Sequence, residues 1–236
     1  GWSLARLADA TAPNRPRVTL VTKAAWADLA WKIRGVDRVV SLDGSGAVAV
    51  RRVAKELRDD PFDRVVDAHN VMRSHLLLGL MARRPDARLA KDTVARLAFM
   101  RFGRRSPCLE RTMRDRFDDL FPEVQAEPGA IVEPPLAHLS PHGVTRPAEA
   151  PLGLAPGAQW STKRWPDNKF NDLAKKFLET SFGTVRIYLG PREETWFADS
   201  PLAALTALDP GGRVEIVRHS TLVGVATSLA GCGRLV

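Results

Sequence analysis

Short apolar, β-branched runs alternate along the chain with segments whose apolar residues recur every three or four positions. This pattern predicts strands over 17–22, 37–42, 62–67 and 88–91, helices over 24–33, 47–58 and 71–83, and a mostly helical segment over 94–121. After residue 151 it predicts strands over 152–155, 184–189, 213–218 and from 234 onward, with helices over 166–179, 193–208 and 221–230. Such alternation is typical of βαβ units, whose parallel sheet is covered by helices on both faces.

The periodicity fails between the two alternating regions, where proline, glycine and polar residues accumulate. We therefore predict a linker over residues 128–150. It would join an N-terminal domain, residues 1–127, to a C-terminal domain, residues 151–236, and both domains would be Rossmann-like. Ligands of such folds bind beyond the carboxyl ends of the strands, so we expect the site in a cleft between the two halves.

The composition has an excess of basic residues. The 236 residues include 35 Lys and Arg against 27 Asp and Glu, a formal net charge of +8. Such a balance predicts an anionic partner, either a nucleic acid, a phosphorylated substrate or an acidic lipid surface. A genome rich in G and C, which encodes arginine throughout, would give the same excess. The cations concentrate in one cluster, formed by Arg96, Arg101, Arg104, Arg105, Arg111, Arg114 and Arg116.

Other features of the composition favour a cytosolic protein. No apolar run approaches the roughly 18 residues that span a bilayer, and no signal peptide opens the chain. Cys108 and Cys232 lack the spacing of metal ligands, so both are predicted to be reduced thiols. The histidines also lack such spacing, and no metal site is predicted.

One strand-to-helix junction, PGAQWSTKRWP over residues 156–166, concentrates polar chemistry. Glycine lets the backbone approach a ligand closely, and Pro166 suits the first position of a helix. Ser161, Thr162, Lys163 and Arg164 would then precede a helix N-terminus, where free N–H groups and the helix dipole favour an anion. The junction predicts a phosphate or diphosphate site. The alternative is an exposed basic loop whose tryptophans pin the helix to the sheet.

Three segments together resemble glycosyltransferase family 9, the lipopolysaccharide heptosyltransferases. PGAQWSTKRWPDNKFNDLAKKF is similar to that family's P-G-A-x-x-x-x-K-x-W-P segment and the helix after it. FDRVVDAHNVMRSHLL, from residue 62, resembles its strand that ends in D-x-[QH] and is followed by an R-S pair. VRIYLGPREE, from residue 185, is a weaker match to its strand-glycine-acid segment.

The resemblance implies an α/β protein of GT-B type, in which two Rossmann-like domains face a cleft. It implies an inverting, metal-independent transfer of heptose from ADP-heptose to the inner core of lipopolysaccharide. No cofactor is expected beyond this donor substrate. The implied location is the cytoplasm, and contact with the inner face of the inner membrane is compatible with it. In that case the arginine cluster would face lipid headgroups or the anionic acceptor, unless it is a solvated helix face with local ion pairs.

The resemblance also implies roles for single residues. Lys163 would contact the donor diphosphate, with Ser161, Thr162 and Arg164 beside it, and Glu193 or Glu194 would reach the ribose. On the acceptor side the matching residues are Asp67, His69, Arg73 and Ser74. Asp67 could instead cap the following helix, and Arg73 could pair with a neighbouring acid.

Two family segments have no counterpart in the sequence, so we expect a fragment that is cut at both ends and inactive alone. The first is an initial strand whose G-D pair carries the expected general base, which leaves the base unassigned here. The second is a D-[ST]-G-x-x-H segment around the donor phosphates.

The alternatives to this function are transfer from another nucleotide-sugar donor, a basic nucleic-acid-binding protein without catalysis, or an envelope protein that keeps the fold. No zinc spacing or helix-turn-helix signature supports nucleic-acid binding.

Overall fold

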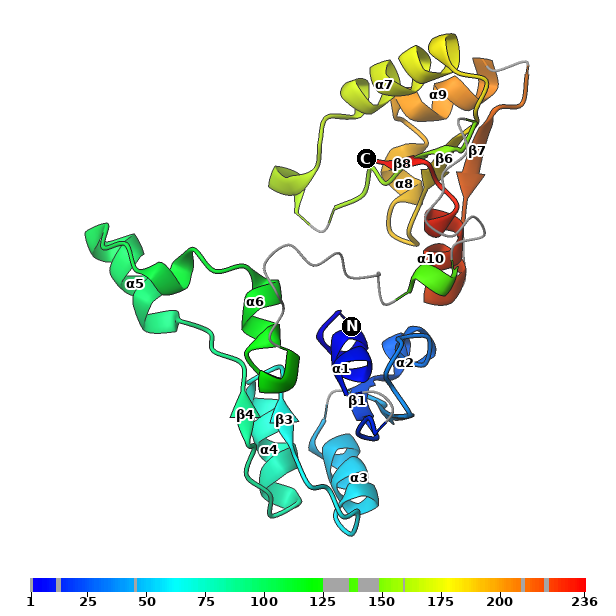
Figure 1. The fold of residues 1–236 in the computed structure, drawn as a ribbon. Helices are drawn as coiled ribbons and strands as arrows, with labels where there is room; N and C mark the ends of the chain where they lie inside the picture. Colours follow the sequence, from blue (N-terminus) through cyan, green and yellow to red (C-terminus); the bar gives the residue numbers. More distant parts are fainter. Residues whose placement is uncertain are drawn as a thin grey trace. The chain divides into compact units, whose positions relative to one another are not determined.

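The computed structural model describes residues 2–11, 14–44, 46–124, 136–139, 149–158, 160–208, 211–218 and 221–236. The chain divides into two compact units, Gly1–Pro135 and Leu136–Val236, shown in Figure 1. Most of the predicted linker, residues 128–150, lies outside the described residues. The boundaries drawn for it from the sequence therefore stay a prediction.

The first unit alternates strands and helices along the chain. Its elements are α1 (Trp2–Ala10), β1 (Thr19–Lys23), α2 (Ala24–Ala30), β2 (Arg38–Leu42), α3 (Ala47–Leu57), β3 (Val66–Asp67), α4 (Met72–Leu80), β4 (Ala87–Arg88), α5 (Thr93–Phe102), η1 (Pro107–Leu109), α6 (Met113–Asp118) and η2 (Pro122–Val124). Its described strands form two separate parallel pairs. Thr19 of β1 lies opposite Arg38 of β2, and Val66 of β3 lies opposite Ala87 of β4.

The core of the first unit follows from the helical periodicity of α3. Val50, Val53, Ala54 and Leu57 recur at intervals of three and four residues and are all buried. They pack with Val40 and Leu42 of β2 and with Met81. This cluster fixes α3 on the β1–β2 pair.

A buried arginine ties α1 to the end of the same unit. Arg6 is 8% exposed, forms an ion pair with Asp118 of α6, and donates to the carbonyl of Val124 at 2.8 Å. Ser3 donates to the same carboxylate at 2.8 Å. Because a buried charge is tolerated only when it is paired, these contacts hold α1, α6 and η2 together.

The second unit has a single four-stranded sheet. Its elements are η3 (Ala137–Leu139), β5 (Leu152–Leu154), η4 (Ser161–Lys163), α7 (Asp167–Thr180), β6 (Val185–Tyr188), α8 (Glu194–Phe197), α9 (Pro201–Leu208), β7 (Val214–Val217), α10 (Leu222–Ala230) and β8 (Arg234–Leu235). The described strands are all parallel, in the order β7-β6-β5-β8.

Side-chain alternation along β6 shows how helices cover both faces of this sheet. Val185 and Ile187 point into the core formed with α7 and α9, which includes Phe170 and Leu202. Tyr188 points to the opposite face, where its hydroxyl lies 2.8 Å from Ser228 Oγ of α10. Neighbouring strand residues face opposite sides of a sheet, so α10 covers the face away from α7.

Two long segments predicted to be helical, 94–121 and 193–208, are largely helical in the structure, but each is divided by a break. The segment 94–121 forms α5, η1 and α6, because Gly103 adopts a left-handed conformation (φ +64°) that ends α5 and Pro107 opens the next turn. The segment 193–208 divides into α8 and α9 because Pro201 starts a new helix. The strand predicted over 62–67 shortens to Val66–Asp67.

Candidate functional site

The junction after β5 leads from a buried strand to an open helix start. Leu152 and Leu154 are buried, and the chain reaches α7 through the 3-10 turn η4. Pro166, with φ −59° and ψ 137°, occupies the cap position and offers no side-chain hydrogen bond to the helix. The first N–H groups of α7 therefore lack a side-chain cap, as an anion-binding helix start requires.

The two cations of this junction, Arg164 and Lys163, differ in their contacts within the protein. Arg164 stacks on Trp196, with its guanidinium carbon 4.5 Å from the ring centroid, and its Nε lies 3.7 Å from Asp167 Oδ1. That carboxylate oxygen is buried and has no hydrogen bond among the described residues, so the ion pair with Arg164 is its electrostatic compensation. Lys163 and Thr162 are exposed. Lys163 is therefore the cation of this pair that remains available to a ligand.

The remaining aromatic and hydroxyl residues of the junction complete its description. Trp165 packs edge-on against Phe170, with centroids 4.9 Å apart, while Trp160 is 60% exposed. Trp165 therefore anchors the loop to α7, as the packing alternative requires. Ser161 has its backbone in η4, but its side chain lies outside the described part of the chain, and the role predicted for it stays a prediction.

The loop after β6 meets the loop after β5 at Glu193. The carboxylate of Glu193 accepts the backbone N–H of Gly190 at 2.7 Å. It also lies so close to Gly157 that any side chain there would collide with it. A side chain at position 157 would therefore displace the Glu193 carboxylate from its hydrogen bond with the N–H of Gly190. The predicted donor residues of both loops are neighbours.

The second predicted acid of this loop, Glu194, already has a partner. Arg218, which directly follows β7, donates through Nη2 to Glu194 Oε2 at 2.9 Å. This hydrogen bond and the charge of Arg218 lower the pKa of Glu194. Of the two acids predicted to reach the ribose, Glu193 is the one whose carboxylate forms no ion pair among the described residues and accepts a hydrogen bond from the N–H of Gly190.

These residues all lie at one edge of the second unit's sheet. Lys163 follows β5, Glu193 follows β6 and Arg218 follows β7, and the three strands are parallel. The carboxyl ends of parallel strands are the usual ligand edge of an open α/β sheet. An exposed lysine and an uncapped helix can hold an anionic group there, and a neighbouring carboxylate can accept hydrogen bonds from hydroxyl groups.

At the junction after β3, in the first unit, the acidic residue Asp67 binds groups of its own turn. The side chain of Asp67 is 1% exposed. Its Oδ1 accepts the N–H of Asn70 at 2.7 Å and that of His69 at 3.2 Å, and the hydroxyl of Ser74 lies 3.1 Å from Oδ2. Burial raises the pKa of Asp67, but these hydrogen bonds and the charge of Arg88 outweigh burial and keep the pKa below its ordinary value.

The other predicted acceptor-side residues lie on the turn that Asp67 holds. Ser74 accepts the N–H of Val71 at 3.0 Å, and so caps the start of α4. His69 is exposed, and Arg73 is partly buried in the first turn of α4. The structure thus gives Asp67 and Ser74 a role in shaping the turn: Asp67 accepts N–H groups that precede α4, and Ser74, not Asp67, makes the hydrogen bond to the cap residue. The acceptor contacts predicted for all four residues stay predictions.

The arginine cluster divides into paired and unpaired members. Arg116 is 5% exposed and pairs with Asp92, Arg111 pairs with Asp119 at 2.6 Å, and Arg114 Nε lies 4.0 Å from Asp118. The ion pairs found among the described residues include none of the more N-terminal members, Arg96, Arg101, Arg104 and Arg105. The local ion-pair alternative therefore holds for the C-terminal part of the cluster.

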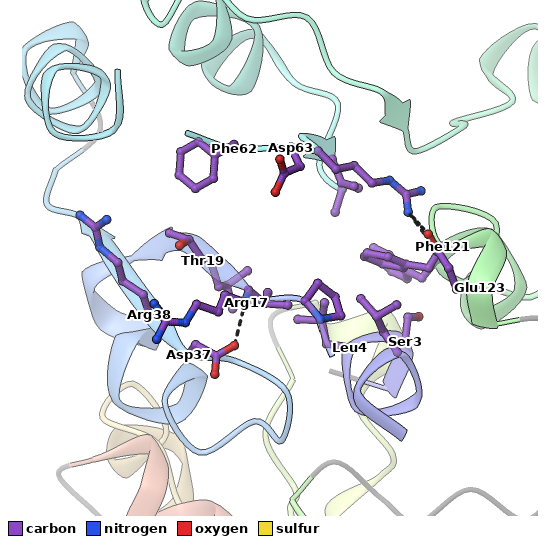
Figure 2. Close-up of a pocket in the computed structure, with 18 of the residues that line it drawn as sticks. Ser3, Leu4, Arg17, Thr19, Asp37, Arg38, Phe62, Asp63, Phe121 and Glu123 are labelled. Carbon is purple, nitrogen blue, oxygen red and sulfur yellow. Dashed lines mark hydrogen bonds and ion pairs between the residues drawn. The ribbon is translucent and has the colours of Figure 1, made fainter. Parts of the chain in front are cut away.

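A cavity of about 1300 Å³ in the first unit was missed by sequence reasoning. Figure 2 shows it bordered by Thr19 of β1, Leu4 of α1, Phe121 and the segment that contains Phe62 and Asp63. Arg114 of the arginine cluster lines it, but none of the residues predicted at the two junctions or in the loop after β6 does. No signal in the sequence points to it, because it results from the separation of the β1–β2 pair from the β3–β4 pair.

The described residues contain no group of three or more His, Cys, Asp or Glu side chains placed to hold a metal ion. Within the same part of the chain, every helix is too short or too polar to cross a membrane.

The chain is similar to known glycosyltransferases. The model of glycosyltransferase family 9 (heptosyltransferase) matches residues 50–207. Lipopolysaccharide heptosyltransferase 1 of Pseudomonas aeruginosa is 28% identical over 192 residues, which are 77% of this chain and 50% of the relative. The chain thus spans about half the length of this curated relative.

Solved structures agree in fold. E. coli heptosyltransferase WaaC with ADP-2-deoxy-2-fluoro heptose has a TM-score of 0.69 at 19% identity, over 99% of this chain and 76% of that chain. E. coli ADP-heptose lps heptosyltransferase II has a TM-score of 0.69 at 15% identity, over 99% and 74%. The predicted fold class, α/β of GT-B type, is confirmed by these neighbours. Since the family model covers well over half of the chain, the chain belongs to glycosyltransferase family 9, the heptosyltransferases.

Proposed function

We propose that the protein to which this chain belongs transfers heptose from ADP-heptose to the inner core of lipopolysaccharide, with inversion and without a metal ion. The observation that carries the proposal is the family match over residues 50–207, which contains the Lys163 junction and the Glu193 loop. Two relatives supply the substrate classes. One is a lipopolysaccharide heptosyltransferase, and one structure holds an ADP-heptose analogue.

The donor's diphosphate is assigned to Lys163 and the start of α7. Lys163 is exposed, and α7 begins without a side-chain cap, so a cation and free N–H groups lie in one short segment. Arg164 supports this segment through Trp196 and Asp167 rather than through the ligand. We therefore assign Arg164 to positioning this segment, and its predicted contact with the donor stays a prediction.

The donor's ribose is assigned to Glu193 in preference to Glu194. Glu193 keeps one oxygen, Oε2, on the N–H of Gly190, so its remaining acceptor capacity can serve hydroxyl groups. Glu194 would first have to leave Arg218, to which both of its oxygens are bonded.

The reaction is a displacement at the anomeric carbon. The acceptor hydroxyl oxygen forms the new C–O bond as the bond to the ADP diphosphate breaks, and a general base removes the hydroxyl proton. We assign no residue of this chain as that base. Lys163 and the α7 N–H groups would stabilise the negative charge on the departing diphosphate, a task that a metal ion performs in other transferases.

The acceptor side and the location complete the proposal. Arg73 is the cation of the β3–α4 junction, and we assign it to an anionic group of the acceptor. We place the reaction in the cytoplasm, at the inner face of the inner membrane, where a lipid-linked acceptor would be reached.

Binding of ADP and ADP-heptose, measured by calorimetry, tests the donor half. Replacing Lys163 by Ala should weaken both ligands by about tenfold or more, because a charge-assisted contact to phosphate is lost. Lys176→Ala is the matched control, since Lys176 is an exposed lysine of the same helix, α7. Equal affinities of the Lys163 variant and the unaltered chain would remove Lys163 from its role. Preference for UDP- or GDP-sugars would identify another donor.

A further inference from the structure

Helix α5 exposes more apolar surface than its surroundings explain. Its ten residues contain no buried side chain. Val94, Leu97, Phe99, Met100 and Phe102 are 82%, 60%, 47%, 77% and 71% exposed. Figure 1 shows α5 apart from the two sheets of its unit. A helix that is apolar on several sides is normally buried in a core or in lipid, so these side chains call for a partner.

The charge around α5 identifies the kind of partner. The chain carries no acidic residue between Asp92 and Glu110, whereas Arg96, Arg101, Arg104 and Arg105 lie in that interval and are all exposed. These are the cluster members that form no ion pair among the described residues. An apolar helix with uncompensated arginines complements a surface that is negatively charged outside and apolar just beneath.

The turn after α5 places the arginines beside the apolar side chains. Gly103 closes the helix in the left-handed conformation, so Arg104 and Arg105 follow the end that carries Met100 and Phe102. The guanidinium carbon of Arg101 lies 5.7 Å from the centroid of the Phe102 ring. Apolar side chains can thus enter the acyl region while the neighbouring guanidinium groups stay among the phosphates.

We propose that α5 and the turn after it, residues 93–105, form a docking surface for an anionic lipid bilayer. The inference deepens the proposed location at the inner membrane and rests on that proposal for its role, but the residues that form the surface belong to the first unit alone. The chemistry recognised is a phospholipid headgroup layer with net negative charge above hydrocarbon chains. Each basic residue near such a surface adds attraction that salt screens, and each inserted apolar side chain adds attraction that salt does not screen.

Co-sedimentation of the chain with vesicles tests the proposal, with phosphatidylglycerol mixed into phosphatidylcholine and pure phosphatidylcholine as the two lipids. The chain should bind the anionic vesicles and bind the neutral ones at least about tenfold more weakly. The double variant Met100→Ser/Phe102→Ser should lose about tenfold or more of its affinity for anionic vesicles. The variant Arg104→Gln/Arg105→Gln should lose about tenfold and show a weaker dependence on salt.

A matched control separates this surface from apolar exposure in general. Val48 and Phe182 are 78% and 90% exposed but lie on α3 and in the second unit. The double variant Val48→Ser/Phe182→Ser should bind vesicles like the unaltered chain. Equal losses in both double variants, or equal binding to neutral and anionic vesicles, would overturn the proposal. Failure to bind vesicles would overturn it too, and a dimer abolished by Met100→Ser/Phe102→Ser would then assign α5 to a second copy.

Circular dichroism and urea denaturation accompany each variant. All of the substituted side chains are exposed, so the midpoint of unfolding should stay unchanged. ADP binding provides an independent readout of the second unit. A chain that binds ADP but not vesicles would contradict the membrane proposal and leave the donor assignment intact.

Discussion

The junction after β3 and the junction after β5 contain the same parts, a strand end, a polar turn and the start of a helix. In the first, Asp67 is buried and its oxygens bind Asn70, His69 and Ser74 of its own turn. In the second, Lys163 is exposed and the helix start is left without a side-chain cap. A residue of a sequence motif can therefore either stabilise the turn that forms the site or remain free to bind the ligand. Its burial and the number of its hydrogen bonds within the protein distinguish the two roles.

The largest effect should come from removing the buried acid. Asp67→Ala leaves two backbone N–H groups and a hydroxyl without their acceptor, so we expect the free energy of unfolding to fall by about 3 kcal/mol. Urea denaturation followed by circular dichroism measures this loss. Asp63→Ala is the control, since Asp63 is an exposed acid just upstream, and it should change stability by less than about 0.5 kcal/mol. Similar losses of unfolding free energy in the two variants would contradict the structural role given to Asp67.

Gly157→Ala should disturb the junction after β5. A methyl group at this position collides with the carboxylate of Glu193, which must turn away and leave the N–H of Gly190. We expect ADP affinity to fall by about tenfold and stability to fall by about 1 kcal/mol. Gly79→Ala is the control, because a side chain there meets nothing within 4 Å and α4 gains a better helix former. Unchanged ADP affinity in the Gly157 variant would show that the loop contact is irrelevant to the donor.

The pH dependence of stability should follow Asp67. Its folded pKa is below the ordinary value of 3.8, so the carboxylate stabilises the fold above about pH 4. That contribution is lost as the pH falls through the lowered, folded-state pKa. Urea midpoints measured from pH 6 downward should therefore decline less steeply below pH 4 in Asp67→Ala than in the unaltered chain. Parallel curves would contradict the assignment.

The smallest effect concerns the pair formed by Glu194 and Arg218. Both side chains are exposed, and such pairs contribute little once salt screens them. Arg218→Ala should leave the urea midpoint unchanged at physiological salt. If Glu194 then competes with Glu193 for the ribose, ADP affinity should rise slightly. A clear loss of ADP affinity would instead assign Arg218 to the ligand.

Most of the fold was accessible from the sequence because hydrophobic periodicity reports local structure. The strands over 37–42 and 184–189 and the helix over 166–179 were predicted to within a few residues. The breaks at Gly103 and Pro201 were missed, although both residues are standard helix terminators. The cavity could not be predicted, since it depends on how distant strands pair.

The site was accessible only in outline. The motifs located both junctions and both loops, because their residues are close in sequence. Whether an acid supports the fold or remains free to bind a ligand depends on contacts between distant segments, such as that of Glu194 with Arg218, or on burial, as for Asp67. Arg164 illustrates the same limit, since its partner Trp196 is 32 residues away and carries no sign of the contact in sequence.

The cavity beside β1 has a consequence for the order in which the molecule opens. Among the described strands of the first unit, β1 pairs with β2 alone and borders the cavity, whereas β5 and β6 of the second unit have a strand on each side. Isolated two-stranded pairs are marginal in water, and amide protons at an open strand edge exchange readily. Deuterium should therefore enter β1 and β3 well before β5 and β6. In this chain, the unit assigned to the acceptor would then loosen before the unit assigned to the nucleotide.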